Sequence, residues 1–480
     1  MTDETVTAQR LVRRFARETN LLVSGRDFSV IGTDGVAEAL RALLPALGAH
    51  LGDAGVVFAP GGTPEILLDG EALPPRERAE DRVDAAGRHM PVATDRARRL
   101  RENGTVRGVR IGIAMVLEPK TAQLALLLRD AGATVAVYAH PDEIDVEVAE
   151  VLRSRGIPVD GDPSLSGAAE RAAAVSFLRR GFDLLLDDGS HLIRLAHEES
   201  LAPQLRGAAE ETTSGLTPLR LMEREGVLEI PVIAVNDALT KISFDNRYGT
   251  GQSCVFAIAD ALDDAGIDLR DQPAVVVGYG PVGEGVAAHL RALGAQVGVS
   301  ETDPVRALRA AHDGYRIGRL HDLAPGALVV SATGAPHTVD AEVLRTAAIV
   351  AVAGGVPHEI DLDASTLRPY EGVNGEASAF VERAGTGALV IARGGCVNLS
   401  AGEGNPIEIM DLSFSVQLFA VEHLLAHELP AGVHPLPAEA DVTIGTAALA
   451  LRGEHIDQRS RAQVDAQREW RSPRFRGESA

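Results

Sequence analysis

The stretch AVVVGYGPVGEGVAAHLRALGAQVGVSETD, residues 274–303, carries the clearest indication of the fold. The apolar run 274–277 predicts a buried strand, a G-x-G-x-x-G turn follows it, and the segment 282–293 predicts a helix closed by Gly294. A second strand then ends at Glu301. A strand, turn, helix and strand in this order are typical of a parallel, doubly wound α/β sheet.

The glycine turn of this stretch predicts a dinucleotide site. Its glycines permit close approach of the backbone to a pyrophosphate, and the helix N-terminus supplies N–H groups and a positive dipole. Glu301 would accept hydrogen bonds from a ribose 2′-hydroxyl and repel a 2′-phosphate, which favours NAD, while Arg306 leaves NADP as an alternative. A turn that binds no nucleotide is the remaining interpretation. The contacts predicted here are Gly278, Gly280, Pro281, Val282, Gly283, Glu301 and Arg306.

Upstream of this stretch, the chain again alternates predicted strands and helices. Strands are predicted over 107–117, 133–139 and 182–188, with helices between them. The charged, proline-bearing segment 71–91 is interpreted as a linker or an exposed helix. Ligands of such sheets lie beyond the carboxyl ends of the strands, so the ends of the first and last of these strands mark a candidate site.

Composition and charge exclude several classes of protein. The 480 residues include 68 acidic and 46 basic side chains, a formal net charge of −22, which argues against nucleic acid or an anionic membrane as a partner. The N-terminus has no apolar signal segment and no apolar run approaches the length needed to span a bilayer, so we expect a cytoplasmic protein. Two cysteines, Cys254 and Cys396, exclude a disulfide framework, and the sequence contains no metal-binding motif and no GxSxG nucleophile elbow.

Only two of the 46 basic residues are lysines, Lys120 and Lys241. A composition bias that replaces lysine by arginine accounts for most of this count. Arginine cannot give up its proton whereas lysine can, so a surviving lysine marks a place where arginine does not suffice. Two residues are a small sample, and the count alone is a weak pointer to function.

Three polar segments are unusual for a buried core: LLDDGSH (185–191), AEETTSG (209–215) and VNDALTKISFDNRYGTGQS (235–253). Each alone could be a capped helix or a turn. Together with GYGPVGEG and SETDP downstream, they resemble the adenosylhomocysteinase (S-adenosylhomocysteine hydrolase) family, over about Met90 to Leu436. The resemblance implies two lobes, a tightly held NAD and a homotetramer or dimer. It also implies oxidation of a ribose 3′-hydroxyl, expulsion of the C5′ substituent, addition of water and reduction of the ketone.

The resemblance implies a role for residues in each polar segment. Lys241 and Asp245 would hold the ribose hydroxyls, Glu211 would organise that pair, and Asp188 would act as an acid or base near C3′ or C4′. A lysine whose pKa is lowered could relay the hydroxyl proton. Further cofactor contacts are implied at Thr212, Thr213, Ser214, Asn246, Thr333, Gly354 and Asn398.

This sequence departs from the family pattern at the positions that, in the family, recognise the base and protonate the leaving group. The family's three site histidines correspond to Val116, Gly355 and Asn405, and the glutamate that reads the adenine amino group corresponds to Lys120. We therefore expect a changed substrate: a nucleoside with a carbonyl or anionic group near Lys120, or a sugar analogue that lacks adenine. His191 and His358 are candidates for the lost acid, although an exposed or satisfied histidine is the simpler interpretation of each. Substrate contacts are predicted at Glu118, Lys120, Thr121, Asn405, Met410 and His358.

Several activities fit these residues. The reaction could end after elimination, as a dehydration that gives a 4′,5′-unsaturated product, or it could be adenosylhomocysteine hydrolysis itself. A net dehydrogenase or epimerase and a non-catalytic NAD-binding regulator are further alternatives, although the retained acidic residues and Lys241 argue against a silent site. The expected fold is α/β, with two doubly wound parallel-sheet lobes. Residues 1–88 would form an N-terminal α/β extension, 89–250 with 403–450 the substrate-binding lobe, 251–402 a Rossmann NAD-binding domain, and 451–480 a polar tail.

Overall fold

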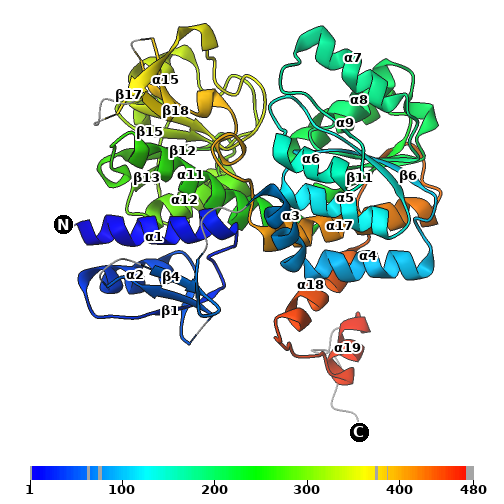
Figure 1. Ribbon diagram of the computed structural model, residues 1–480, viewed down its shortest axis with the longest axis horizontal. Coiled ribbons are helices and arrows are strands. Elements are labelled where there is room, and N and C mark those ends of the chain that lie inside the picture. Colours follow the sequence, from blue (N-terminus) through cyan, green and yellow to red (C-terminus); the bar gives the residue numbers. More distant parts are fainter. Residues whose placement is uncertain are drawn as a thin grey trace.

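The computed structural model describes residues 3–53, 55–61, 65–73, 78–372, 377–385 and 387–471. Two large lobes lie side by side, and a smaller N-terminal unit lies beneath one of them (Figure 1). The small unit consists of α1 (Asp3–Thr19), β1 (Asp27–Val30), α2 (Gly35–Ala46), β2 (His50–Leu51), β3 (Val56–Ala59), β4 (Glu65–Leu68) and β5 (Glu71–Ala72). Its strands form one mixed sheet in the order β2-β1-β3-β4-β5.

The first large lobe contains a seven-stranded, fully parallel sheet in the order β20-β11-β10-β9-β6-β7-β8. Its edge strand β20 follows the whole of the second large lobe in the sequence. Its elements are α3 (Ala79–Arg88), α4 (Pro91–Asn103), β6 (Arg110–Ala114), α5 (Pro119–Asp130), β7 (Thr134–Tyr138), α6 (Val146–Ser154), β8 (Val159–Asp160), α7 (Gly167–Leu178), β9 (Leu184–Asp187), α8 (His191–Glu198), β10 (Gly207–Glu210), α9 (Thr213–Glu225), β11 (Pro231–Ala234), α10 (Leu239–Ile242), α17 (Ile407–Ala426), β20 (Gly432–His434) and α18 (Ala438–Leu451).

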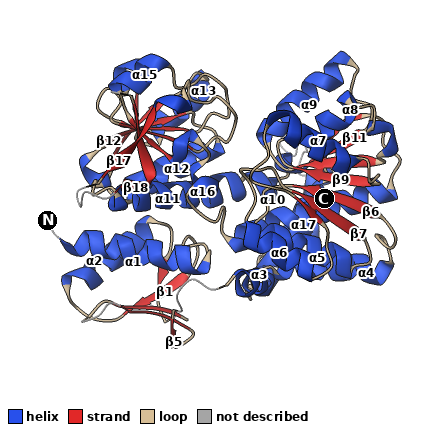
Figure 2. Cartoon of the chain, turned by 45° about the horizontal axis from the view of Figure 1, so that its top comes forward, coloured by secondary structure: helices blue, strands red, loops and turns tan. Residues whose placement is uncertain are grey.

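The second large lobe contains an eight-stranded sheet in the order β14-β13-β12-β15-β16-β19-β18-β17. Its parallel strands follow the Rossmann order, and antiparallel β18 and β17 extend one edge. Helices cover both faces of each large sheet (Figure 2). Its elements are α11 (Thr250–Asp264), β12 (Pro273–Val277), α12 (Pro281–Ala292), β13 (Gln296–Ser300), α13 (Pro304–His312), β14 (Arg316–Ile317), α14 (Leu320–Leu323), β15 (Leu328–Ser331), α15 (Ala341–Thr346), β16 (Ile349–Val352), β17 (Leu367–Glu371), β18 (Ala377–Ala384), β19 (Leu389–Ile391) and α16 (Val397–Ser400).

The expected fold class is confirmed, and the expected strands and helices around 107–188 and 274–300 are present with ends shifted by a few residues. The segment 71–91, interpreted as a linker or exposed helix, contains β5, α3 and the start of α4. α3 buries Val83 and Ala86 against the first lobe, so it is a packed helix. The residue boundaries of the predicted domains stay predictions.

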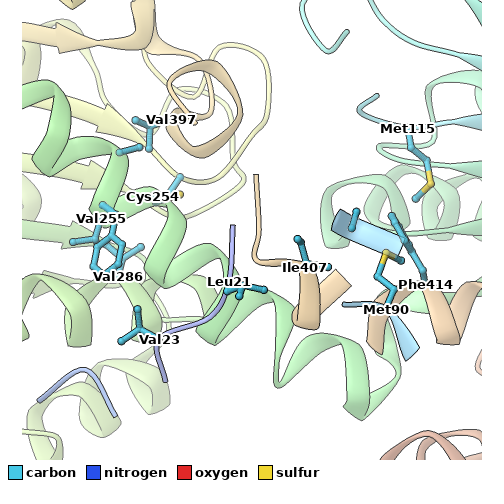
Figure 3. Close-up of a cluster of buried hydrophobic side chains, with 14 of the residues drawn as sticks. Leu21, Val23, Met90, Met115, Cys254, Val255, Val286, Val397, Ile407 and Phe414 are labelled. Atoms are coloured by element: carbon cyan, nitrogen blue, oxygen red, sulfur yellow. The ribbon is translucent and has the colours of Figure 1, made fainter. Parts of the chain in front are cut away.

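One continuous apolar core joins the three units. Leu21 and Val23 from the small unit, Val255 from the Rossmann lobe, and Ile407 and Phe414 from the first lobe belong to the same buried cluster (Figure 3). Backbone hydrogen bonds and side-chain ion pairs also connect the three units. Unlike apolar contacts, these bonds depend on geometry and so help to fix the orientation of the units. The N–H of Ile407 donates to the carbonyl of Asn20 at 2.9 Å, and the buried Arg13 pairs with Asp260 of α11 at 2.7 Å.

Helix α17 corrects one expectation. The sequence predicts no apolar run long enough to span a bilayer. Within the described residues, however, α17 is long and apolar enough to do so by length and composition alone, with a mean hydropathy of 1.3. Within the fold, 61% of its apolar window is buried, and it packs against α4, α10 and α18. Its apolar character therefore belongs to the core of the first lobe.

A short segment extends from the lobes at the C-terminal end. Helix α19 (Arg461–Arg468) follows α18 and lies apart from both large sheets in Figure 1, with most of its side chains exposed. A polar tail was predicted over 451–480, and the last nine of these residues lie outside the described part.

Candidate active site

A cavity of about 750 Å³ lies between the two large sheets, beyond the carboxyl ends of β6, β9 and β10 on one side and of β12, β13 and β15 on the other. Two doubly wound sheets that face each other in this way bring their ligand-binding edges together. The predicted site residues that line it are Glu118, Lys120, Thr121, Asp188, Glu211, Thr212, Thr213, Ser214, Lys241, Asp245, Asn246, Gly278, Gly280, Pro281, Val282, Glu301, Arg306, Thr333, Gly354, Asn398, Asn405 and Met410.

The glycine turn after β12 has room for a pyrophosphate only because its glycines lack side chains. Gly278 has a φ of +90°, and a Cβ on Gly283 would lie 1.9 Å from the carbonyl oxygen of Gly278. A Cβ on Gly280 would meet only Arg306, at 3.6 Å, so this glycine faces open space beside the N-terminus of α12. The turn therefore fits a dinucleotide, and Gly283, which does not line the cavity, shapes it from behind.

Glu301 follows β13 and faces the same half of the cavity. Its carboxylate accepts the backbone N–H groups of Tyr279 and Thr302, each at 2.6 Å. Burial alone would raise the pKa of Glu301, but hydrogen bonds from backbone N–H groups outweigh burial and hold it below the ordinary value. An ionised carboxylate at this position suits a ribose hydroxyl and opposes a 2′-phosphate.

The opposite wall carries a buried lysine among carboxylates. The Nζ of Lys241, on α10, lies 2.7 Å from Oδ2 of Asp245, 3.0 Å from Oδ1 of Asn246 and 3.9 Å from Oε1 of Glu211. Burial lowers the pKa of Lys241, but the carboxylates of Asp245 and Glu211 outweigh burial, and the pKa is raised. The expectation of a lowered lysine pKa is therefore wrong for this arrangement. Lys241 can accept a proton only after it passes one of its own to a neighbouring carboxylate.

Glu211 is held from behind by helix α17. Gln417 Nε2 donates to its Oε2 at 2.6 Å, and Ser413 Oγ donates to its Oε1. Burial raises the pKa of Glu211 to about 7, although Lys241 opposes this shift. A carboxyl with a pKa near neutrality beside a lysine can hold or release a proton at physiological pH.

Asp188 follows β9, and its backbone N–H donates to the carbonyl of Ala114 in the neighbouring strand at 2.9 Å. Burial raises the pKa of Asp188, whereas the ammonium of Lys241 lowers it. Asp188 therefore faces the same cation as Asp245 and Glu211, from a different strand end. The first lobe thus gathers three carboxylates around one lysine, an arrangement suited to moving protons from a bound alcohol.

Asn405 contacts protein groups through both ends of its amide. Its Nδ2 donates to Oδ1 of Asp245 at 2.6 Å and to Oγ1 of Thr250 at 3.1 Å. Its Oδ1 accepts from Oγ of Ser253 at 2.8 Å and from Nδ2 of Asn398 at 3.1 Å. Asn405 was predicted to contact substrate, but the structure places it as a bridge between Asp245 and Asn398.

Lys120 is also engaged by protein groups. Its Nζ lies 2.6 Å from Oε2 of Glu118, 2.7 Å from the carbonyl oxygen of Glu403 and 3.2 Å from Oδ1 of Asn20, and the side chain is 1% exposed. These three acceptors match the three protons of an ammonium. A ligand carbonyl can reach Lys120 only by displacing one of them, and Asn20 makes the longest contact. Glu118 also caps α5, because its carboxylate accepts from the N–H groups of Lys120 and Thr121.

Neither candidate histidine lines the cavity. His358 is exposed on the loop after β16, with its ring stacked on that of His337 at 6.5 Å between centroids. His191 begins α8 and packs edge-on against His140. Burial, with repulsion from His140 and Arg194, lowers the pKa of His191 to about 4, so it is not an acid at neutral pH. Both predictions of a replacement acid are therefore unsupported by geometry.

Ser413, Gln417, Cys396 and Glu143 are among the cavity or supporting residues that the sequence did not predict. Ser413 and Gln417 lie four residues apart on apolar α17, so polar residues at helical spacing were the available signal. Cys396 lines the cavity and its Sγ contacts Oδ1 of Asn398 at 2.9 Å. Glu143 lines the cavity from the loop after β7, and no sequence motif marks it.

A nucleotide turn on one lobe and a buried lysine with carboxylates on the other define a two-lobed, NAD-binding α/β enzyme. A model of the S-adenosyl-L-homocysteine hydrolase NAD-binding domain matches residues 246–404. An adenosylhomocysteinase of Archaeoglobus fulgidus is 38% identical over 400 residues, which cover 81% of this chain and 98% of that protein. The chain belongs to the adenosylhomocysteinase family, and its cofactor is NAD.

Two further relatives bear on the substrate. An S-inosyl-L-homocysteine hydrolase of Methanopyrus kandleri is 35% identical over 418 residues, 85% of this chain and 97% of that protein. An adenosylhomocysteinase of Thermotoga maritima is 34% identical over 403 residues, 82% of this chain and 99% of that protein. Relatives named adenosylhomocysteinase and relatives named S-inosyl-L-homocysteine hydrolase are thus about equally similar to this chain in sequence. The expectation that the substrate differs from S-adenosylhomocysteine gains no support from these comparisons.

Proposed function

We propose that this enzyme oxidises the 3′-hydroxyl of a nucleoside-type substrate transiently and removes the C5′ substituent by elimination, with addition of water completing a hydrolysis. The observation that carries the proposal is the 2.7 Å contact between Lys241 and Asp245 within a cavity that also contains the glycine turn. The nicotinamide of bound NAD would supply the two-electron oxidant for the 3′-carbon. The glycine turn, Glu301 and Asn398 would hold that cofactor.

The residues of the first lobe perform the proton transfers in this proposal. Lys241 donates a hydrogen bond to the 3′-oxygen and stabilises its anion, while Asp245 receives the proton that leaves the hydroxyl. Glu211 orients Lys241 from the other side. The 3′-ketone acidifies the C4′ proton, which Asp188 removes. The electron pair of that C–H bond then forms a C4′–C5′ double bond as the C5′ substituent departs.

We further propose that the base wall favours a keto base over adenine. Lys120 is the donor there, and Glu118, which could accept from an amino group, is already bonded to the ammonium of Lys120, the hydroxyl of Thr121 and the backbone N–H groups of both. A purine carbonyl can replace Asn20 as an acceptor for Lys120, whereas an amino group cannot. The name of the Methanopyrus relative supports a keto purine as one substrate of this family.

The test uses the NAD-loaded protein with four probes: S-adenosylhomocysteine, S-inosylhomocysteine, adenosine and inosine. Thiol release reports elimination from the first two, and nicotinamide absorbance with deuterium uptake at C4′ reports oxidation of all four. We expect oxidation, exchange and thiol release. A 4′,5′-unsaturated product that accumulates would identify a lyase that stops before water addition, whereas lasting nicotinamide reduction would identify a dehydrogenase. No oxidation of any probe would refute the proposal.

A homo-oligomer in the cytoplasm completes the proposed function. Support for the oligomer comes from large apolar side chains exposed towards the C-terminal end: Val442, Leu451, Ile456 and Trp470, with Trp470 83% exposed. Exposed apolar groups gathered in one segment are typical of a surface that is covered by a partner. Light scattering of the purified protein checks the mass, and a monomer at micromolar concentration would refute this part.

A further inference from the structure

The proposed function leaves one proton without a donor. A thiol or hydroxyl group that departs from C5′ needs a proton, because its anion is a poor leaving group. The family histidine that resemblance assigns to this task corresponds to Val116, an apolar residue that lines the cavity. Neither His191 nor His358 reaches the cavity wall. A different acid must therefore face the same part of the cavity if the reaction proceeds.

Glu143 lies on the loop after β7, beside the loop after β6 that carries Val116. The N–H of Leu117 donates to the carbonyl of Glu143 at 2.8 Å, and the N–H of Asp145 donates to the carbonyl of Leu117 at 2.9 Å. This short parallel bridge, between Leu117 and Ile144, fixes the two backbones side by side. Both Val116 and Glu143 line the cavity, so the bridge brings a carboxyl beside the position that the histidine has left.

The carboxyl of Glu143 is free to meet a ligand. Within the described part of the chain, its side chain has no hydrogen-bond partner and no ion pair, whereas Glu118, Glu211 and Asp245 on the same cavity are all bonded to protein groups. The side chain of Glu143 is half-buried and borders the cavity, so its carboxyl can donate to a bound ligand without first breaking a contact with the protein.

The surroundings of Glu143 favour its protonated form. Burial raises the pKa of Glu143 to about 8, and repulsion from carboxylates adds to that effect. The charged groups that face it are Asp142 on its own loop, Asp187 and Asp188 at the end of β9, and Glu170 of α7. All four are carboxyl groups. His140, three residues before Glu143 in the chain, pairs with Glu170 at 3.0 Å.

Resting on the proposed function, we propose that Glu143 is the general acid that protonates the C5′ leaving group. As the C5′–S or C5′–O bond breaks, the bond pair goes to the heteroatom, the proton of Glu143 joins it, and a neutral thiol or water departs. The electrons of the former C4′–H bond form the C4′–C5′ double bond. When water adds at C5′, the carboxylate of Glu143 takes its proton and the acid is restored.

Asp188 and Glu143 take different roles in the proposed reaction because different charged groups surround them. Lys241 faces Asp188 and stabilises its anion, which suits a base for the C4′ proton. The charged groups that act most strongly on Glu143 are carboxylates, which suits an acid. Burial raises the pKa of both carboxyls, but the ammonium of Lys241 opposes this rise at Asp188 whereas neighbouring carboxylates add to it at Glu143, so the two can serve as base and acid at one pH.

The test compares Glu143→Gln with the wild type and with Asp142→Asn, an exposed neighbour that does not line the cavity. Glu143→Gln should keep NAD reduction and C4′ deuterium exchange with adenosine or inosine within about threefold. Thiol release from S-adenosylhomocysteine and S-inosylhomocysteine should fall by roughly 100-fold or more, the usual contribution of a general acid. Asp142→Asn should keep all three. The wild-type rate of thiol release should fall as the pH rises through about 8.

A leaving group that needs no proton separates chemistry from structure. 5′-Chloro-5′-deoxyinosine and its adenosine counterpart release chloride, so Glu143→Gln should eliminate from them at a rate within about threefold of the wild type. Equal thiol release by Glu143→Gln and wild type, or an equal loss with the chloro compounds, overturns the role of Glu143 and leaves the proposed function standing. Absence of oxidation and exchange in the wild type overturns both.

Discussion

The side-chain amide of Asn405 donates to Oδ1 of Asp245 across 2.6 Å, while Lys241 contacts the other carboxylate oxygen at 2.7 Å. Asn405 lies in the segment by which the chain returns from the Rossmann lobe to the first lobe, and its amide oxygen accepts from Asn398. One amide therefore links the carboxylate proposed for proton transfer with the residue proposed to meet the nicotinamide. The orientation of Asp245 therefore depends on a residue that lies 160 positions further along the chain.

Asn405→Ala should slow oxidation without abolishing it. Loss of a hydrogen bond to a charged group costs about 1.5–3 kcal/mol, so NAD reduction by inosine or adenosine should slow by roughly 10- to 100-fold. Stopped-flow absorbance measures this rate, and released NAD measures cofactor content, which should stay within about twofold. Asn405→Asp keeps the size of the side chain but repels Asp245, and should be slower still. An Asn405→Ala rate equal to the wild type would remove Asn405 from the account.

Gly283→Ala should disrupt the cofactor site. The added Cβ would lie 1.9 Å from the carbonyl oxygen of Gly278, so the turn must shift, at a cost of about 1–3 kcal/mol. NAD content after purification should fall by roughly tenfold or more, and the thermal midpoint should fall with it. Gly445→Ala is a matched control, because a Cβ there meets nothing within 4 Å and α18 gains helix propensity. Full NAD content in Gly283→Ala would contradict the close packing of this turn.

Lys120→Gln should change the choice of base. Glutamine keeps a donor for Glu118 but adds an acceptor for an amino group, so the ratio of kcat/KM for S-inosylhomocysteine over S-adenosylhomocysteine should fall roughly tenfold. Thiol release with each substrate gives the ratio. Arg82→Gln is the control, because Arg82 contacts the same Glu403 loop without lining the cavity. An unchanged ratio of kcat/KM values would show that Lys120 stabilises the loop at Glu403 and has no part in the choice of base.

Acid should stabilise the NAD-free protein relative to alkaline solution. Burial raises the pKa of Glu143 to about 8 and that of Glu211 to about 7, both above their values in the unfolded chain. The folded state therefore holds these protons more tightly, and the free energy of unfolding contributed by these groups falls as the pH rises from about 4.5 to about 8. Urea unfolding over this range measures the slope. Glu143→Gln should flatten it, and an identical slope in the variant would mean that Glu143 titrates normally.

The local patterns predicted the fold well because they are properties of short segments. The strand at 274–277 and the helix at 282–293 were predicted from adjacent residues, and the structure has β12 and α12 there. The lysine count pointed to Lys120 and Lys241, which both line the cavity. The strand and helix signals depend on neighbours within about one turn or strand, whereas the lysine count is a property of the whole chain.

The features that the sequence patterns did not predict depend on residues distant in sequence. Lys120 lines the cavity, but its partners Asn20 and Glu403 lie far away in the chain and were not visible as a pattern. The raised pKa of Lys241 depends first on Asp245, four residues along the chain, and then on Glu211 from another strand end. Glu143 belongs to no motif, and only the bridge to Leu117 brings it beside Val116. Tertiary contacts of this kind leave no periodic signal.

The most direct test of the central claim is single-turnover oxidation of inosine and adenosine in heavy water by NAD-loaded wild type and Lys241→Met. For the wild type we expect rapid nicotinamide reduction and deuterium at C4′ of the recovered nucleoside. For the variant we expect a loss of both by roughly 1000-fold, with NAD content retained, because Lys241 contacts no residue of the glycine turn. Equal reduction and exchange in Lys241→Met, or neither in the wild type, would contradict a site built for 3′-oxidation.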